Sequence, residues 1–259
     1  MSNEIFVRNP HSIFQALKSR PKDVLEITLP REKQDDVWEG IEALAERNKV
    51  RVNQPGGASM VRSQVKPQGR GQGRNQKGPQ PAMGRESGHG ASIRPKLGIS
   101  LEEMFKGISD SSRGVWLALD CLQDPQNLGA IFRSAAFFGV KGIIMTTERS
   151  APMTATVYDI SSGGVEAVPM VQTINLKQAL DKAKEAGLWI LGTSEHAKES
   201  LHKVAKDRPW LVVLGNEEKG IRRLTEEACD VMCSIPPKGE GVTSLNVSVA
   251  TGVLLSHLS

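Results

Sequence analysis

Cysteine is scarce in this sequence, and its three copies form no recognisable pattern. Cys121, Cys229 and Cys233 are odd in number, show no C-x-x-C spacing and have no histidine near them in the sequence. A disulfide framework needs pairs, and a structural zinc site needs closely spaced Cys or His ligands. We therefore expect reduced, packed thiols and no bound metal.

Long hydrophobic runs are also missing. No apolar stretch approaches the roughly 18 residues of a membrane-spanning helix. The first ten residues contain Glu4 and Arg8 and lack the apolar core of a secretion signal. We expect a cytoplasmic protein that neither enters a membrane nor is secreted.

Acidic residues are nearly absent from residues 51–100. This stretch contains nine Lys and Arg residues and a single acid, Glu86, which gives it a net charge of +8. The whole chain has a formal charge of +4, so the remainder is at −4. The basic excess therefore belongs to one segment, and the rest of the chain is mildly acidic.

That basic segment has the composition of a disordered region. From about residue 55 to residue 94 it consists largely of Gly, Gln, Pro, Ser and Arg, with the run GRGQGR over residues 69–74. So polar a run buries too little apolar surface to offset the entropy of ordering it. We predict a disordered basic linker over residues 55–97, which either binds RNA through its charge or only connects its flanks.

The sequence on either side of this segment reads as two α/β units. In residues 1–54, apolar runs predict strands at 5–7, at 24–29 and from 50 onward, with helical stripes between them. In residues 98–259, strands and helices alternate, which predicts a mostly parallel sheet covered on both faces. The expected strands of this unit are 115–119, 142–145, 167–171, 188–192, 210–214 and 231–235, and one expected helix is 176–186.

Three polar segments of the second unit have the form of ligand-binding loops. Residues 124–139 predict a capped helix, and residues 211–220 predict an apolar strand that ends in a glycine-flanked loop. Residues 235–250 predict a loop before a helix that Ser244 or Asn246 caps. Free N–H groups at such a helix start suit a ligand with a carboxylate or phosphate.

One charge in the first of these segments is isolated. Arg133 is the only charged residue between Asp124 and Lys141, and its neighbours three and four positions away are apolar or glycine. A solvated helix face normally carries other charges beside it. We therefore expect Arg133 to point into a site.

Together the three segments resemble the motifs of the SpoU (TrmH-like) RNA ribose 2′-O-methyltransferases of the SPOUT superfamily. The resemblance implies a trefoil-knotted α/β methyltransferase domain over residues 98–259, S-adenosylmethionine as cofactor, an RNA substrate and a homodimer. The likeness is greatest to the bacterial enzymes that methylate a guanosine of large-subunit (23S) rRNA. A tRNA ribose methyltransferase and a non-catalytic RNA-binding protein of the same fold are the alternatives. The matching motifs are Asn127-x-x-Gly-x-x-x-Arg133, Leu214-Gly-Asn-Glu-x-x-Gly220 and Ile235-Pro…Ser244-Leu-Asn-Val-Ser-x-Ala250.

The same resemblance implies two sets of site residues. A guanidinium stays protonated, so we expect Arg133 to hold phosphate and stabilise charge rather than act as a base. Glu217 either orients Arg133 or Asn127 or caps the next helix, and Ser244 and Asn246 are site residues or caps. The catalytic set is Asn127, Arg133, Glu217, Ser244 and Asn246, and the cofactor-binding set is Thr193, Gly215, Ile235 and Leu245.

Residues 1–54 resemble the small RNA-binding domain that precedes the methyltransferase domain in this family. Lys18, Arg20 and Lys22 follow its first expected helix and are either phosphate contacts or a solvated helix end. In the larger unit, the family often carries a lysine just before the segment 161–166, where this chain has Tyr158 and Asp159.

Overall fold

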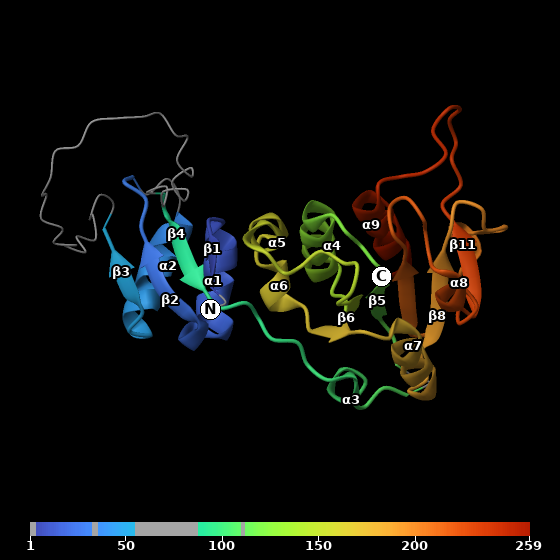
Figure 1. Ribbon diagram of the computed structural model, residues 1–259, viewed down its shortest axis with the longest axis horizontal. Coiled ribbons are helices and arrows are strands. Elements are labelled where there is room, and N and C mark those ends of the chain that lie inside the picture. Colours follow the sequence, from blue (N-terminus) through green and yellow to red (C-terminus); the bar gives the residue numbers. More distant parts are fainter. Residues whose placement is uncertain (1–3, 33–35, 55–87, 110–111) are drawn as a thin grey trace, which may run out of the picture.

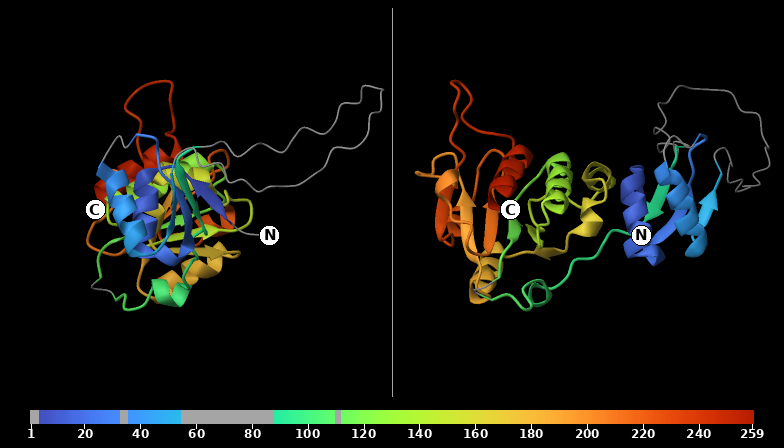
Figure 2. Two further views of the ribbon diagram at one scale, coloured as in Figure 1. Left: turned by 90° about the vertical axis from the view of Figure 1, so that its left-hand side faces the viewer. Right: turned by 180° about the vertical axis from the view of Figure 1, so that it is seen from behind.

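The computed structural model describes residues 4–32, 36–54, 88–109 and 112–259 of the 259-residue chain (Figure 1). These residues form a small α/β domain and a larger α/β domain that lie side by side. The helix α1 of the small domain faces the helices α5 and α6 of the larger one, as both Figure 1 and the rear view in Figure 2 show.

The small domain is a four-stranded sheet with two helices packed on it. The sheet order is β1-β4-β2-β3, in which β2 and β3 are parallel and the other pairs antiparallel. Ile13, Leu17 and Ile41 are fully or almost fully buried between the helices and the sheet. The elements are β1 (Ile5–Val7), α1 (Pro10–Ser19), η1 (Pro21–Asp23), β2 (Val24–Thr28), α2 (Asp36–Arg47), β3 (Arg51–Asn53) and β4 (Gly90–Ile93).

Strand β4 corrects the predicted division of the chain. The sequence analysis assigns residues 55–97 to a linker, yet β4 pairs with β1 on one side and β2 on the other. Ala91 and Ile93 are completely buried, so this short apolar alternation is the centre of the small sheet. The small domain therefore includes residues 88–93. The Gly/Arg/Gln-rich run joins two of its strands, and the predicted disorder of residues 55–87 lies outside the described residues.

The larger domain is a seven-stranded sheet, in the order β7-β6-β5-β10-β8-β11-β9. Every pair of neighbouring strands is parallel, as predicted. One predicted strand starts too early, because residues 164–167 form a helix and the strand begins at Met170. The strands are β5 (Val115–Leu119), β6 (Ile143–Thr146), β7 (Met170–Thr173), β8 (Trp189–Thr193), β9 (Glu199–Ser200), β10 (Trp210–Leu214) and β11 (Val231–Ser234).

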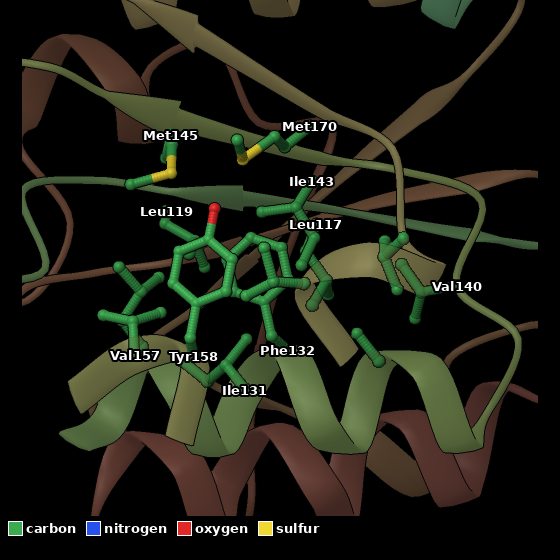
Figure 3. Packing of buried hydrophobic residues seen from close by; sticks show 14 of the residues in the cluster. Leu117, Leu119, Ile131, Phe132, Val140, Ile143, Met145, Val157, Tyr158 and Met170 are labelled. Atoms are coloured by element: carbon green, nitrogen blue, oxygen red, sulfur yellow. The ribbon is translucent and has the colours of Figure 1, made fainter. Parts of the chain in front are cut away.

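Helices cover both faces of this sheet, which confirms the α/β prediction. One face carries α4, α5, α6 and α9, and the other carries α3, α7 and α8 (Figure 1). Figure 3 shows Phe132 of α4 and Tyr158 of α5 reaching toward Leu119 and Met145 on the strands. The helices are α3 (Leu101–Met104), α4 (Pro125–Phe137), α5 (Ala155–Ser161), α6 (Gly164–Ala167), α7 (Leu176–Glu185), η2 (Leu201–Lys203), α8 (Arg223–Glu226) and α9 (Val247–Leu258).

The described residues contain neither a membrane-spanning helix nor a metal-binding cluster. Among their helices, none has both the length and the apolar character needed to cross a bilayer. Within the same residues, no group of three or more His, Cys, Asp or Glu side chains is placed to hold a metal ion.

Candidate functional site

A cavity of about 560 Å³ lies at the carboxyl ends of the central parallel strands. It is lined by residues 193–196 after β8, 214–221 after β10 and 242–247 before α9, together with Ile235 after β11. This is the edge where open α/β sheets bind ligands, and the volume suits a small molecule. The loop between β11 and α9 extends beyond the sheet at this edge (Figure 1).

The four predicted cofactor-binding residues all line this one cavity. Thr193 ends β8, and its hydroxyl donates a hydrogen bond of 2.9 Å to the Val213 carbonyl of the neighbouring strand. Ile235 and Leu245 reach the cavity from the two ends of the loop between β11 and α9. These four residues are far apart in the sequence, and the fold brings them together at one cavity.

Gly215 is required because its own loop returns close to it. A Cβ on Gly215 would lie 2.2 Å from the carbonyl carbon of Gly220 in the same loop. Asn216 and Gly220 form an isolated antiparallel bridge, and the Asn216 Oδ1 accepts from the N–H groups of Glu218 and Lys219. The glycine lets the loop fold back on itself, and that fold presents Glu217.

The sequence analysis missed the ion pair that fixes the base of this loop. Asp120 is completely buried at the end of β5 and accepts from the Arg222 Nε at 2.7 Å and from the Arg222 N–H at 3.1 Å. Both ends of the loop are thereby fixed to the sheet, since the Asp120 N–H also donates to the Leu214 carbonyl. A carboxylate directly after an unbroken apolar strand was the signal that could have revealed it.

Asn127, Glu217 and Asn246 form one hydrogen-bonded chain across three motifs. The Asn127 side-chain amide donates to Glu217 Oε1 at 3.1 Å, and Asn127 Oδ1 accepts from Asn246 Nδ2 at 3.0 Å. The predicted orientation of Asn127 by Glu217 is confirmed. Glu217 caps no helix, because its loop is a turn and α8 begins only at Arg223.

Asn246 is also the residue that caps α9. Its Oδ1 accepts from the Ser248 N–H at 2.9 Å, so the choice left open between Ser244 and Asn246 falls to Asn246. Ser244 lines the cavity with an exposed side chain. One asparagine thus starts the helix and joins the polar chain at the cavity.

Arg133 stands apart from the other predicted catalytic residues. It lies six residues after Asn127 on α4, about 9 Å along the helix axis, and its side chain is exposed. Among the described residues it neither lines the cavity nor makes a hydrogen bond or ion pair. Within one chain, the structure does not bring Arg133 into the site, so its role there stays a prediction.

The charged residues that line the cavity are mostly acidic. It includes four glutamates, Glu195, Glu217, Glu218 and Glu226, and one lysine, Lys219. His196 also contributes to the lining. Burial raises the pKa of the Cys233 thiol, another lining residue, to about 12, so this cysteine is protonated at neutral pH and is no nucleophile.

Comparison with known proteins identifies this arrangement. The SpoU rRNA Methylase family matches residues 114–256, which is more than half of the chain and contains the whole site. The chain belongs to the SpoU rRNA methylase family. Of the three segments that resemble SpoU motifs, 211–220 and 235–250 line the cavity, and 124–139 is joined to them through the hydrogen bonds of Asn127.

Among curated relatives, a 23S rRNA (guanosine-2′-O-)-methyltransferase of Nitrosomonas europaea is 43% identical over 156 residues. That match covers 60% of this chain and 59% of the relative, less than two thirds of its length. The enzyme of the same name from Pseudomonas syringae is 33% identical over 247 residues, which cover 95% of this chain and 91% of the relative.

Solved structures extend the SpoU likeness to both domains. The SpoU methyltransferase AviRb from Streptomyces viridochromogenes, in complex with the cofactor AdoMet, superimposes with a TM-score of 0.72. The superposition covers 99% of this chain and 90% of that one, at 20% sequence identity. At this identity the comparison shows a shared fold.

Proposed function

We propose that this chain is an S-adenosylmethionine-dependent RNA 2′-O-ribose methyltransferase that acts on a guanosine of 23S rRNA in the cytoplasm. The observation that carries the proposal is the hydrogen-bonded chain of Asn127, Glu217 and Asn246, which joins the three SpoU motifs beside one cavity. The names of the curated relatives support guanosine in 23S rRNA as the substrate.

The cavity has the properties that S-adenosylmethionine needs. A volume of about 560 Å³ is within the usual range for a cofactor of this size. Its acidic lining favours a ligand that carries a sulfonium and an ammonium group. We assign cofactor binding to Thr193, Gly215, Ile235 and Leu245, since a relative of the same fold binds AdoMet. The bound cofactor supplies a methyl group already activated by its positive sulfur.

The residues of the polar chain hold the acceptor ribose and its environment in place. Glu217 accepts from Asn127 with one oxygen and lies 3.3 Å from Asn216 Nδ2 with the other, so its carboxylate is fixed. Holding the reacting groups in a fixed orientation is one of the large contributions that an enzyme makes to the rate. Arg133 stays protonated and is suited to hold an RNA phosphate, which leaves removal of the 2′-OH proton to a neighbouring group or to that phosphate.

We also propose a homodimer formed through α4 and α9. Phe137 is 83% exposed, and Val249 and Val253 are 53% and 39% exposed, on two helices that pack together. Phe137 follows Arg133 by one helical turn, so both lie on the same face. A second copy over this face shields these apolar side chains and places Arg133 at the interface. The trefoil knot that the family implies is part of the same proposal.

The deciding experiment is nucleoside-resolved mapping of 2′-O-methylation in rRNA and tRNA from cells with and without the gene. We expect loss of one guanosine mark in 23S rRNA and its return when the wild-type gene is restored. Loss of a tRNA mark instead would keep the chemistry and change the substrate. Loss of no mark would favour a non-catalytic RNA-binding protein.

A single substitution tests the assigned role of Arg133. Arg133→Ala should lower methyl transfer to purified 23S rRNA by at least about a hundredfold, because oriented charge stabilisation is lost. S-adenosylmethionine binding, measured by calorimetry, should change less than about threefold, since Arg133 does not line the cavity. Lys177→Ala, on the opposite helix layer, serves as the control. A fully active Arg133→Ala enzyme would remove the residue from the mechanism.

A further inference from the structure

The start of α1 in the small domain is hydrogen-bonded to α5 and to the turn between α5 and α6. Asp159 Oδ1 accepts from the backbone N–H groups of Arg8 at 2.7 Å and Asn9 at 2.8 Å. Ser12 Oγ accepts from the Gly163 N–H at 2.8 Å. These bonds fix the direction in which α1 meets the larger domain, and they give Asp159 a role that the sequence did not reveal.

The end of α1 contributes a buried ion pair to the same interface. Arg20 donates from Nε to Glu166 Oε2 at 2.8 Å and from its terminal nitrogen to Glu166 Oε1 at 2.7 Å. The two side chains are only 13% and 2% exposed. Such a guanidinium–carboxylate pair with two hydrogen bonds fixes both the distance and the relative orientation of the end of α1 and α6. Arg20 is therefore an interdomain residue, and the alternative of a phosphate contact does not apply to it.

The segment that connects the domains contributes the third contact. The ammonium of Lys96 donates to three carbonyls at the end of α6, those of Val165, Glu166 and Val168, at 2.8 to 3.0 Å. The Lys96 N–H donates to the Tyr158 hydroxyl at 2.6 Å. Burial lowers the pKa of Lys96, and the nearby Glu166 carboxylate opposes that shift. The connection is thus bonded to the larger domain along its course.

The helices α5 and α6, to which the small domain is bonded, lie directly against α4. A Cβ on Gly164 of α6 would lie 2.5 Å from the Phe132 carbonyl oxygen and 2.9 Å from the Arg133 nitrogen. A Cβ on Gly129 of α4 would lie 2.8 Å from the Ile160 Cβ of α5. At Gly164 the backbone of α6 meets the backbone of α4 with no side chain between, so a shift of α6 is passed to α4 at Arg133.

We propose that docking of the small domain onto α5 and α6 sets the position of α4, and that Arg20 and Glu166 are positioning residues for methyl transfer. The inference rests on the proposed function. It adds that the domain interface, which is remote from the cavity, affects the rate of methyl transfer. Helix α6 has four residues and is too short to hold its own place, so its position depends on these interdomain bonds. Among the described residues, those that line the cavity come from other parts of the chain than the small domain and α4 to α6.

The test compares Arg20→Met, Glu166→Met and the double variant in the full-length chain. Each single change leaves one buried charge without its partner, whereas the double change removes both charges. We expect kcat for 23S rRNA methylation to fall by roughly ten- to a hundredfold in each single variant and to recover in the double variant. The dissociation constant for S-adenosylmethionine should stay within about twofold. Arg51→Met is the control, because Arg51 makes an exposed ion pair with Glu26 in the same domain.

Tyr158 supplies an independent measure of docking, because it is the only tyrosine in the chain. Burial raises its pKa to about 12, and exposure of its hydroxyl on undocking returns the value toward about 10. Unchanged kcat in single variants whose Tyr158 titration shows undocking would overturn the proposal, and so would a parallel loss of cofactor binding. A wild-type chain without methyltransferase activity contradicts the proposed function instead, and the titration still reports the docking.

Discussion

Tyr158 combines a buried ring with an ionisable hydroxyl at the domain interface. The ring is completely buried in the core of the larger domain (Figure 3), and the hydroxyl accepts from Lys96. Burial is the main reason that its pKa is raised to about 12. This one side chain therefore links alkaline titration to the stability of the native structure.

The sign of that linkage predicts alkaline destabilisation. Below about pH 10 the phenol is protonated in both states, and the stabilisation is fully present. Between about pH 10 and pH 12 the unfolded chain loses its proton first, so the free energy of unfolding falls by up to about 3 kcal/mol. Urea denaturation at a series of pH values measures this fall. Tyr158→Phe should lack this component, and an equal fall in that variant would assign it to other groups.

Single residues were predicted best where chemistry restricts the choice of residue. Asn246 was expected as a cap or a site residue; it caps α9, and its side chain also donates to Asn127 beside the cavity. Glu217 was expected to orient Asn127 and accepts a hydrogen bond from it. Arg133 was expected to point into a site, but its exposure on α4 depends on what covers that helix. A sequence pattern can reveal an isolated charge such as Arg133, but it does not show which other surface packs against that residue.

The loop after β10 shows what an element needs in order to hold a functional side chain. Gly215 allows its close return, and the buried Asp120 holds Arg222 at its far end. Removal of the Asp120 charge leaves the guanidinium without its carboxylate and frees the base of the loop. Loss of this charge should therefore lower the stability of the protein and also weaken cofactor binding.

Asp120→Asn should lower the free energy of unfolding by roughly 2–3 kcal/mol. It should also weaken S-adenosylmethionine binding by at least about tenfold, because Gly215 and Glu217 line the cavity. Chemical denaturation and calorimetric titration measure the two quantities. Asp181→Asn, which breaks an exposed ion pair with Lys177, is the matched control. Cofactor affinity that stays normal would show that the loop keeps its shape without this pair.

Element prediction succeeded for long apolar runs and failed for short ones. Residues 115–119 and 210–214 are unbroken apolar runs, and both are central strands with the predicted bounds. Strand β4 has four residues beside a long polar run, so its own pattern carried little signal. The short helix α6 was not predicted, and the strand expected at 167–171 began at its last residue. In both cases tertiary packing decides the structure, and local periodicity does not report it.

At the scale of the whole molecule, the two-domain division was predicted but its boundary was wrong. Thr28 pairs with Asn53 on one side and with Gly90 on the other, so the chain leaves and re-enters the small sheet at the same end. The two strand ends are therefore about 10 Å apart, two strand spacings. The basic run is attached to the small domain at both ends and does not separate it from the larger one.

This attachment sharpens a deletion experiment. Replacement of residues 56–87 by a few Gly and Ser residues spares β4, and closing so short a gap costs little. The deletion removes six Lys and Arg residues and one Glu. We expect weaker rRNA binding and a salt dependence whose logarithmic slope falls by up to about four. Filter binding across a salt series measures both.

A full-length variant with those six basic residues changed to Gln separates charge from length. It should match the deletion if the segment binds RNA, and it should match the wild type if the segment only joins two strands. Binding that is unchanged in both variants would assign RNA contacts to the folded domains alone.

The pairing of β1 with β4 also determines when the small domain can fold during synthesis. Ile5 pairs with Ile93, so the first strand made must wait until the chain has been synthesised as far as the fourth. During that interval the nascent small domain has an open sheet edge and an incomplete core, and loop closure over this distance slows its folding. The small domain is thus completed only as the larger domain begins to be synthesised, and the newly made chain is prone to aggregation at that stage.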